Sequence, residues 1–264
     1  MLVIASNLTT RNPRISRILR KLELKDTIAE LQELSRQCAS AGADVLDINL
    51  QQHHDHPEVM EFAVKAVQEV TDRRLCLSTG NVKTLEVGLK ACKRPPWVNY
   101  VSIEEGRLRD MLPLIAENGA GVVLLVGDPA APGDAEQMIK KAAILVGAAN
   151  EVGIPHSSIL LDPGLFHITG GTGQHYLTEV TEFLRALTDV FEPPVKSTCW
   201  ISNASVGAPA RLRPVIETAL LAMLSGLGLA SVFIDVLRRE NMRMVRLIKI
   251  LQNEVIYSAG EIEL

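Results

Sequence analysis

Aromatic residues are scarce in this chain, and positive charge is not in excess. Phe, Trp and Tyr make up 4% of the 264 residues, and 27 Lys and Arg stand against 31 Asp and Glu, for a formal net charge of −4. Proteins that bind single-stranded nucleic acid stack bases on aromatic rings, and those that bind duplexes or anionic membranes carry basic surfaces. The composition argues against both kinds of partner, and it predicts a core of Leu, Val, Ile and Ala.

Cysteine is also rare, and its spacing fits neither a zinc site nor a disulfide framework. The four cysteines are Cys38, Cys76, Cys92 and Cys199, and none belongs to a CxxC pair. We therefore expect free, mostly buried thiols in a cytoplasmic protein that binds no metal directly. The run His53-His54-Asp55-His56 invites a metal interpretation, but neighbouring loop residues rarely face one ion, and we interpret it as the approach to a helix.

Short runs rich in β-branched residues alternate with longer helical runs along the whole chain. Strands are predicted at 2–6, 44–49, 75–78, 98–102, 121–126, 158–162, 197–202 and 230–235. Helices are predicted near 25–41, 57–71, 83–91, 106–118, 134–152, 177–190, 213–226 and 239–253. The glycine-rich segment 164–174 is predicted to be a loop. Eight such units in 264 residues favour one closed (β/α)8 TIM barrel as a single domain, residues 1–264. No GxGxxG follows the first strand, which argues against a dinucleotide-binding sheet.

Polar side chains collect at the carboxyl ends of these strands, where a parallel barrel has its active site. They are amides, hydroxyls and a few carboxylates: Ser6, Asn7, Asp47, Asn49, Ser78, Asn81, Asn99, Asp162, Ser202, Asn203 and Asp235. The set contains no Lys, Arg or His, so it lacks the groups of a phosphate site, a hydrolytic metal site or a Schiff-base aldolase. It does suit a flat heterocycle, because one carboxylate can accept both adjacent N–H groups of a 2-amino-4-oxo pyrimidine edge.

Several segments, in the same order and with nearly the same spacing from Met1 to about Tyr257, resemble one family. They are GADVLDIN (42–49), LCLSTGNVKTLEVGLKACK (75–93), the strand that carries Asn99, LLDP (160–163) and WISNAS (200–205). These segments are similar to the methyltetrahydrofolate:corrinoid protein methyltransferases. That family belongs to the pterin-binding barrel superfamily, together with dihydropteroate synthase and the folate domain of methionine synthase.

The resemblance implies a reaction and a role for each matching residue. Asn99 and Asp162 would hold the pterin, and Asn203 would be the catalytic residue, hydrogen-bonded near the nitrogen that carries the methyl group. The other residues predicted to bind the pterin are Asp47, Asn49, Ser78 and Ser202. Arg213 would lie at the barrel mouth and contact the partner. The implied enzyme is a homodimer that moves a methyl group between tetrahydrofolate and the cobalt of a corrinoid (cobalamin) carried by a partner protein.

The sequence departs from the family pattern at two strand ends. The third strand of the family usually ends in Asp, where this chain has Ser78, and Ser6 and Asn7 replace an acidic and a basic residue. Losing one charge-assisted hydrogen bond would weaken pterin binding by roughly 1.5–3 kcal/mol. A non-catalytic pterin-binding subunit therefore stays open. So does a dihydropteroate synthase, although the strands at 197–202 and 230–235 lack the cations with which that enzyme holds pyrophosphate.

Overall fold

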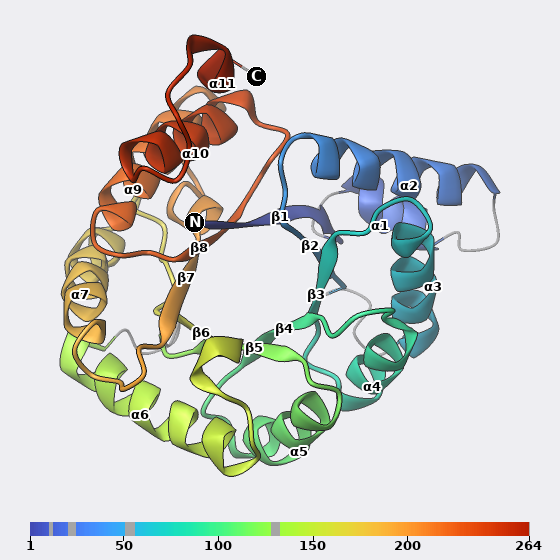
Figure 1. The fold of residues 1–264 in the computed structure, drawn as a ribbon, viewed down its shortest axis with the longest axis horizontal. Helices are drawn as coiled ribbons and strands as arrows, with labels where there is room; N and C mark the ends of the chain where they lie inside the picture. The colour runs from blue at the N-terminus through green and yellow to red at the C-terminus, as the bar shows by residue number, and fades with distance from the viewer. Residues whose placement is uncertain (11–12, 21–24, 51–55, 128–132, 264) are drawn as a thin grey trace.

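Eight parallel strands close into a barrel, and helices surround it on the outside (Figure 1). The computed structural model describes residues 1–10, 13–20, 25–50, 56–127 and 133–263. The strands pair in chain order, and β8 pairs with β1 to close the barrel. They are β1 (Leu2–Thr9), β2 (Val45–Asn49), β3 (Arg74–Ser78), β4 (Trp97–Val101), β5 (Gly121–Leu125), β6 (Ile159–Asp162), β7 (Lys196–Trp200) and β8 (Ser231–Ile234). The predicted (β/α)8 barrel is confirmed.

Each predicted helix is present, and the helical layer differs from the prediction at its first and last helices, at the end of β7 and at the start of the helix that follows β6. The helices are α1 (Pro13–Arg20), α2 (Lys25–Ser40), α3 (Pro57–Gln68), α4 (Val82–Ala91), α5 (Glu105–Glu117), α6 (Ala135–Glu151), α7 (Gly171–Leu187), α8 (Ile201–Ala204), α9 (Arg213–Ser225), α10 (Arg239–Leu251) and α11 (Ala259–Glu263). Helices α1 and α11 were not predicted. Residues 201–202 were predicted to continue β7, whereas they begin the short helix α8, so the strand ends at Trp200.

Helix α7 begins six residues before its predicted start, inside the segment interpreted as a loop. Its first turn packs tightly on the preceding chain: a Cβ on Gly173 would lie 2.0 Å from the carbonyl oxygen of His167. The glycine is needed there for close approach between two backbone segments, not for a flexible loop. Glycine content alone therefore led to the wrong prediction for residues 171–174.

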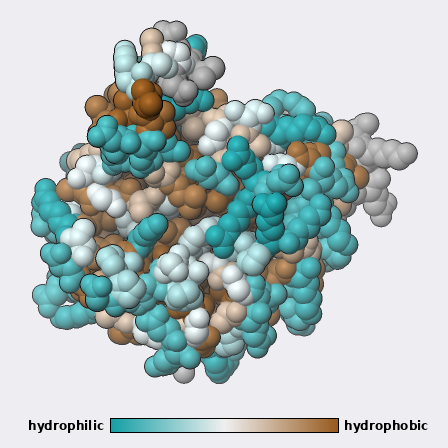
Figure 2. All heavy atoms as spheres, in the orientation of Figure 1, coloured by the Kyte–Doolittle hydropathy of each residue, from teal (hydrophilic) through white to brown (hydrophobic). Residues whose placement is uncertain are grey.

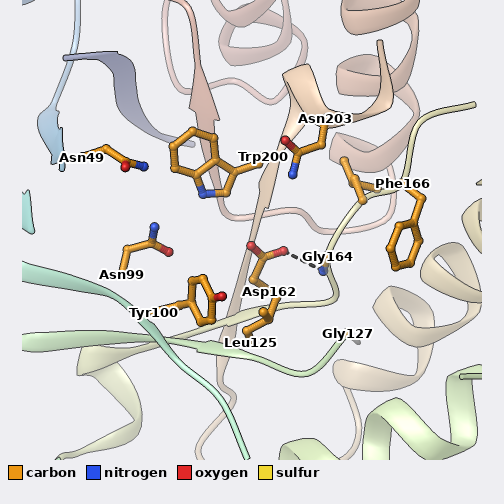
Figure 3. Close-up of a pocket in the computed structure, with 11 residues that line it drawn as sticks. Asn49, Asn99, Tyr100, Leu125, Gly127, Asp162, Gly164, Phe166, Trp200 and Asn203 are labelled. Atoms are coloured by element: carbon orange, nitrogen blue, oxygen red, sulfur yellow. Dashed lines mark hydrogen bonds between the residues drawn. The ribbon is translucent and has the colours of Figure 1, made fainter. Parts of the chain in front are cut away.

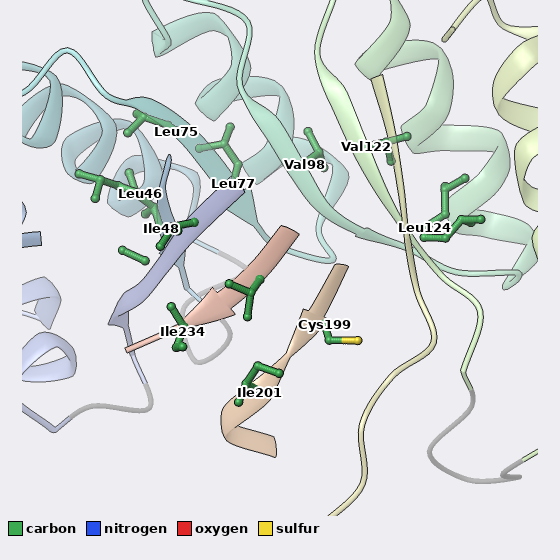
Figure 4. Packing of buried hydrophobic residues seen from close by; sticks show 14 of the residues in the cluster. Leu46, Ile48, Leu75, Leu77, Val98, Val122, Leu124, Cys199, Ile201 and Ile234 are labelled. Carbon is green, nitrogen blue, oxygen red and sulfur yellow. The ribbon is translucent and has the colours of Figure 1, made fainter. Parts of the chain in front are cut away.

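Apolar side chains form two layers, one inside the barrel and one between the barrel and the helices. Figure 4 shows part of the layer between the barrel and the helices. The two layers follow from the alternation of side chains along each strand. The inner layer comprises Ile4, Val45, Cys76, Trp97, Val123, Leu160 and Phe233. Trp97 fills the amino-terminal end of the barrel, where a Cβ on Gly121 would lie 2.5 Å from its ring. Because the lower barrel is filled, only the carboxyl ends of the strands are left for a cavity.

The distribution of polar and apolar residues on the surface and the burial of the cysteines can be compared with what the sequence predicted. Hydrophilic residues dominate the rim of the molecule in Figure 2, and hydrophobic ones gather beside α10, where Leu251, Ile256 and Tyr257 are exposed. All four cysteines are free; Cys92 is half-buried and the other three are buried, as predicted. No helix in the described ranges is both long enough and apolar enough to cross a bilayer.

Candidate functional site

A cavity of about 180 Å³ lies at the carboxyl ends of the strands, where the polar side chains were predicted to meet (Figure 3). Four of the predicted residues line it: Asn49 from β2, Asn99 from β4, Asp162 from β6 and Asn203 from α8. The remaining lining residues are Tyr100, Leu125, Gly127, Gly164, Leu165, Phe166 and Trp200. Side chains from four separate parts of the chain thus share one hollow, as expected from the ends of parallel strands.

Aromatic side chains form walls of the cavity that the sequence analysis did not identify. Trp200 lines the cavity at the end of β7, and its ring stacks on Phe233 of β8, with centroids 4.6 Å apart and planes at 9°. Tyr100 lies on another side, with the guanidinium of Arg107 5.1 Å from its ring centre. Flat, partly apolar walls with polar groups between them suit a planar heterocycle. The alternation of side chains along a strand could have identified Trp200. It lies two residues after Thr198, on the side of β7 that faces the inside of the barrel.

The carboxylate of Asp162 faces the cavity from the end of β6 (Figure 3). Its Oδ1 accepts the backbone N–H of Gly164 at 2.8 Å. Burial raises the pKa of Asp162 to about 7, because the loss of solvation outweighs this one hydrogen bond. A carboxyl group in this state ionises readily when a ligand brings N–H donors to it.

Tight packing holds the turn that follows Asp162 in place. The hydroxyl of Tyr176 donates to the carbonyl oxygen of Pro163 at 2.6 Å. A Cβ on Gly127, after β5, would lie 2.0 Å from that same oxygen, so only glycine fits there. The orientation of the Asp162 carboxylate is therefore set by the barrel scaffold before any ligand arrives.

Asp47 and Ser78 lie beside the cavity wall but are not among its lining residues. Asn49, Ser78 and Asn99 are register partners on β2, β3 and β4, and Asp47 lies one inward-facing position below Asn49. The Ser78 hydroxyl donates to Asp47 Oδ1 at 2.6 Å, and Asn99 Nδ2 donates to Ser78 Oγ at 2.8 Å. Burial raises the pKa of Asp47 to about 7, while hydrogen bonds from Ser78, Cys76 and Asn49 oppose that rise. Direct contact of Asp47 or Ser78 with a ligand stays a prediction.

A second cavity, of about 300 Å³, adjoins the first and shares Asn203 with it. Its lining residues include Ser6, Asn7, Ser202, Arg213, Glu217, Asp235 and Arg238. Ser202 and Arg213 thus lie on this cavity and not on the first. Arg213, which the family resemblance predicted at the barrel mouth, lines this cavity together with Arg238, which was not predicted. Arg238 follows β8 by four residues and so lies beyond the strand end.

Glu217 of α9 is the centre of a buried network beneath the second cavity. Its side chain is 2% exposed. Glu217 Oε1 accepts from Ser205 Oγ at 2.6 Å, and Oε2 accepts from Arg238 Nη1 at 2.6 Å and from Asn241 Nδ2 at 3.1 Å. The network joins the end of α8 to α9 and α10, and α8 carries Asn203. In the sequence analysis Glu217 was unremarkable, because its partners are brought together only by the packing of the helices.

Glu217→Ala is expected to destabilise the protein by about 3 kcal/mol, at the low end of the cost of breaking a buried ion pair, since Arg238 is 27% exposed. The substitution leaves Arg238, Ser205 and Asn241 without their carboxylate partner. Urea unfolding followed by circular dichroism measures the loss. The matched control is Glu136→Ala, which breaks an exposed pair with Lys140 and should cost less than about 1 kcal/mol. Equal losses of stability in both variants would show that the buried network stabilises the protein no more than an exposed ion pair does.

Among the described residues, no group of three or more His, Cys, Asp or Glu side chains is placed to hold a metal ion. His53, His54 and Asp55 of the run noted in the sequence lie outside the described residues. His56 precedes α3 and contacts Glu58, with Nδ1 3.2 Å from Oε1. The part of that run which can be described therefore reads as a helix start.

A filled parallel barrel with a buried carboxylate, side-chain amides and stacked aromatic walls at its mouth defines a protein that binds a planar, nitrogen-rich ring. The chain matches the family of pterin binding enzymes over residues 13–234, and it belongs to that family. Over 249 residues it is 24% identical to methylcorrinoid:tetrahydrofolate methyltransferase of Eubacterium limosum; the match covers 92% of this chain and 88% of that protein.

Two solved structures of dihydropteroate synthase share the fold. The enzyme from Yersinia pestis, with a pterine-sulfa conjugate, is similar with a TM-score of 0.65 at 15% identity, over 96% of this chain and 94% of the other. The enzyme from Clostridium difficile, in the presence of pteroic acid, gives a TM-score of 0.71 at 16% identity, over 95% and 96%. At these identities the likeness supports the barrel alone.

Proposed function

We propose that this protein is a methyltransferase that moves a methyl group between a reduced folate and the cobalt of a corrinoid carried by a partner protein. The observation that carries the proposal is the shared cavity of Asn99, Asp162 and Asn203. The likeness to a named methylcorrinoid:tetrahydrofolate methyltransferase along most of the chain supports it. Tetrahydrofolate or methyltetrahydrofolate is the small-molecule substrate, and the corrinoid is the partner's.

In this proposal Asp162 holds the ring by its 2-amino-pyrimidine edge. Its ionised carboxylate accepts the ring N–H and one hydrogen of the neighbouring amino group, as a bidentate acceptor. The indole of Trp200 offers a flat surface to the ring. Asn49 and Asn99 supply amide groups to the remaining polar atoms of the heterocycle. The cavity thus satisfies both the shape and the hydrogen-bonding pattern of a pterin.

Asn203 then acts on the methyl-bearing nitrogen. When the methyl group leaves for cobalt(I), the carbon–nitrogen bond breaks and its electron pair stays on the nitrogen. A tertiary amine is a poor leaving group unless its nitrogen gains a proton or a strong hydrogen bond at that moment. Asn203 lines both cavities, so its amide can donate to that nitrogen at the boundary between them. The second cavity, with Arg213 and Ser202, is the proposed approach for the corrinoid partner.

A dihydropteroate synthase, which the sequence analysis left open, is the second candidate; the two solved structures of that enzyme share the fold with this chain and no more. That reaction releases pyrophosphate, which needs free cations at the site. Arg238 is engaged by Glu217, and Lys196 is at the start of β7, the end of the strand away from the cavity. Arg213 is the cation of the second cavity with no ion pair among the described residues. One such arginine supports the methyltransferase better than a pyrophosphate-releasing enzyme.

Stopped-flow spectroscopy tests the function. The enzyme is mixed with methyltetrahydrofolate and a cobalt(I) corrinoid, and the reverse reaction starts from a methylcorrinoid and tetrahydrofolate. We expect conversion between the cobalt(I) and methylcobalt spectra in at least one direction. No conversion in either direction, with tight folate binding, would instead support a non-catalytic pterin-binding subunit. Product formation from a pterin diphosphate and para-aminobenzoate would make the chain a dihydropteroate synthase.

Pterin affinity is expected to increase about tenfold between pH 6 and pH 8. The pKa of Asp162 is about 7 in the empty cavity, and the carboxylate must be ionised to accept two N–H groups. Binding at pH 6 therefore releases a proton from most molecules, and binding at pH 8 from few. Calorimetry at pH 6 in buffers of different ionisation enthalpy counts that proton. Asp162→Asn is the control that should remove the proton release due to Asp162; a flat profile in the unmodified protein contradicts the assignment.

Three further expectations stay proposals. A homodimer is implied by the family resemblance, and residues 221–231, which include the exposed Met223 of α9, are the candidate segment for its interface. The single-domain organisation over residues 1–264 and the cytoplasmic location rest on the sequence analysis alone.

A further inference from the structure

Three buried polar side chains connect the interior of the barrel to the cavity wall. Asp47, Ser78 and Asn99 are each 5% exposed or less. They form a chain across three neighbouring strands, with Ser78 Oγ 2.6 Å from Asp47 Oδ1 and Asn99 Nδ2 2.8 Å from Ser78 Oγ. Of the three, Asn99 lines the cavity, and it does so beside Asn49. Asp47 therefore reaches the site through two hydrogen bonds and not by direct exposure to the cavity.

The chemistry of the three groups determines which of them donates and which accepts in each hydrogen bond. At pH 8, where the relay is to be tested and Asp47 is mostly ionised, its carboxylate can only accept hydrogen bonds, whereas a serine hydroxyl has one proton to donate. Asp47 takes that proton, so the Ser78 oxygen can only accept, and the group facing it must be the NH₂ of Asn99. The carbonyl oxygen of Asn99 is then turned away from Ser78, and Oδ1 has no hydrogen-bond partner within the described structure. A buried acceptor without a partner costs free energy that a ligand N–H would recover.

We propose that Asp47 is a positioning residue that acts through Ser78 to hold Asn99 as a hydrogen-bond acceptor, and so sets a preference for ligands with a ring N–H at that edge. The inference rests on the proposed function, because it takes the ligand to be a pterin. With Asp162 on the 2-amino-pyrimidine edge, the ring N–H that remains nearby is at N8. A tetrahydropterin has this N–H, whereas a fully oxidised pterin has only a lone pair there. The chain should therefore discriminate between the two oxidation states.

The hydrogen-bonded relay of Asp47, Ser78 and Asn99 also bears on the end of β3, where the family resemblance implied an aspartate and this chain has Ser78. Ser78 occupies that position and carries no charge, but a carboxylate lies 2.6 Å from its hydroxyl, on the neighbouring strand. The negative charge thus lies on Asp47 of β2 and not at the end of β3, and it acts on Asn99 through Ser78. The affinity lost with the direct carboxylate contact is partly replaced by a fixed amide acceptor at Asn99.

The test measures the ratio of affinities for tetrahydropterin and oxidised pterin by anaerobic calorimetry. In Asp47→Asn the new amide can either donate to Ser78 or accept from it, so the orientation of Asn99 is no longer enforced. In Ser78→Ala the relay is cut. We expect the ratio to fall about tenfold in each variant, the equivalent of one hydrogen bond, and Asp47→Asn to add nothing in the Ser78→Ala background. Ser231→Ala removes a buried hydroxyl bonded to Thr198 elsewhere inside the barrel and should leave the ratio unchanged.

A merely structural role for Asp47 would weaken binding of both ligands alike and leave their ratio unchanged. An unchanged ratio in Asp47→Asn and Ser78→Ala, or additive effects in the double variant, overturns the relay while the proposed function stands. Failure of the unmodified protein to bind either ligand overturns the proposed function itself. If Asp47→Asn does not fold, Ser78→Ala alone decides: a lowered ratio supports the relay, and a retained one contradicts it.

Discussion

Asp162→Ala is expected to weaken tetrahydrofolate binding at least a hundredfold at pH 8. The carboxylate is the acceptor for two N–H groups of the ring, and each charge-assisted hydrogen bond contributes about 1.5–3 kcal/mol. Losing both costs roughly 3 kcal/mol or more, which corresponds to a hundredfold in Kd. Asp162→Asn should weaken binding by at least as much, because its Oδ1 still accepts from Gly164 while its NH₂, itself a donor, faces the ligand donors. Calorimetry with each variant gives the values.

The control for this substitution is Asp134→Ala, at the N-terminus of α6. Asp134 accepts from the backbone N–H of Gln137, so its loss should cost about 1 kcal/mol of stability and leave folate affinity intact.

The unliganded Asp162→Asn protein should in turn be more stable at pH 8 than the unmodified one. The pKa of Asp162 is raised on folding, so its effect on stability becomes unfavourable as pH rises from about 4 through 7. Undiminished folate affinity in Asp162→Ala contradicts the site.

Asn203→Ala is expected to slow methyl transfer about a hundredfold with little change in folate affinity. Its amide is proposed to strengthen its hydrogen bond only as the carbon–nitrogen bond breaks, and removing one such donor typically costs 10²–10³ in rate, as a rough guide. Single-turnover stopped-flow measurements separate this step from binding. The hydrogen bond that Val206 donates to residue 203 is made by the backbone, so α8 should persist in the variant.

Asn118→Ala provides the matched control for Asn203. Asn118 caps the end of α5, where its Nδ2 donates to the carbonyl oxygen of Leu114 at 2.8 Å. Its replacement removes an amide of the same size outside the cavity and should leave the rate within a factor of about two. An Asn203→Ala enzyme that transfers methyl groups at the unmodified rate would remove the amide from the mechanism.

The barrel could be predicted because its signals are local. Strand alternation, helix length and the order of the units are written along the chain, and each predicted strand and helix is present. The errors came where close packing of the backbone determines the local structure. Gly173, in the first turn of α7, lies against the backbone of His167, and the chain turns into α8 directly after Trp200. Residue propensities alone predict neither feature.

Part of the cavity lining could also be predicted from local signals, but the side-chain networks behind it could not. Asn49 and Asp162 end their strands, Asn99 lies within β4 and Asn203 follows β7 by three residues, so barrel topology assigns all four to the same end of the barrel. The Glu217 network and the Asp47 relay depend on partners up to 31 residues apart in the chain, and a partner is known only when register and packing are known. Ser78 is an example. In the sequence it replaces an expected aspartate, and in the structure its hydroxyl is hydrogen-bonded to the carboxyl group of Asp47.

A crystal structure of the protein with bound tetrahydrofolate would show how the site holds its ligand. We expect the 2-amino-pyrimidine edge on the carboxylate of Asp162, the ring against Trp200, and the methyl-bearing nitrogen within hydrogen-bond distance of Asn203. A ring bound outside this cavity, or one whose pyrimidine edge points away from Asp162, would contradict it.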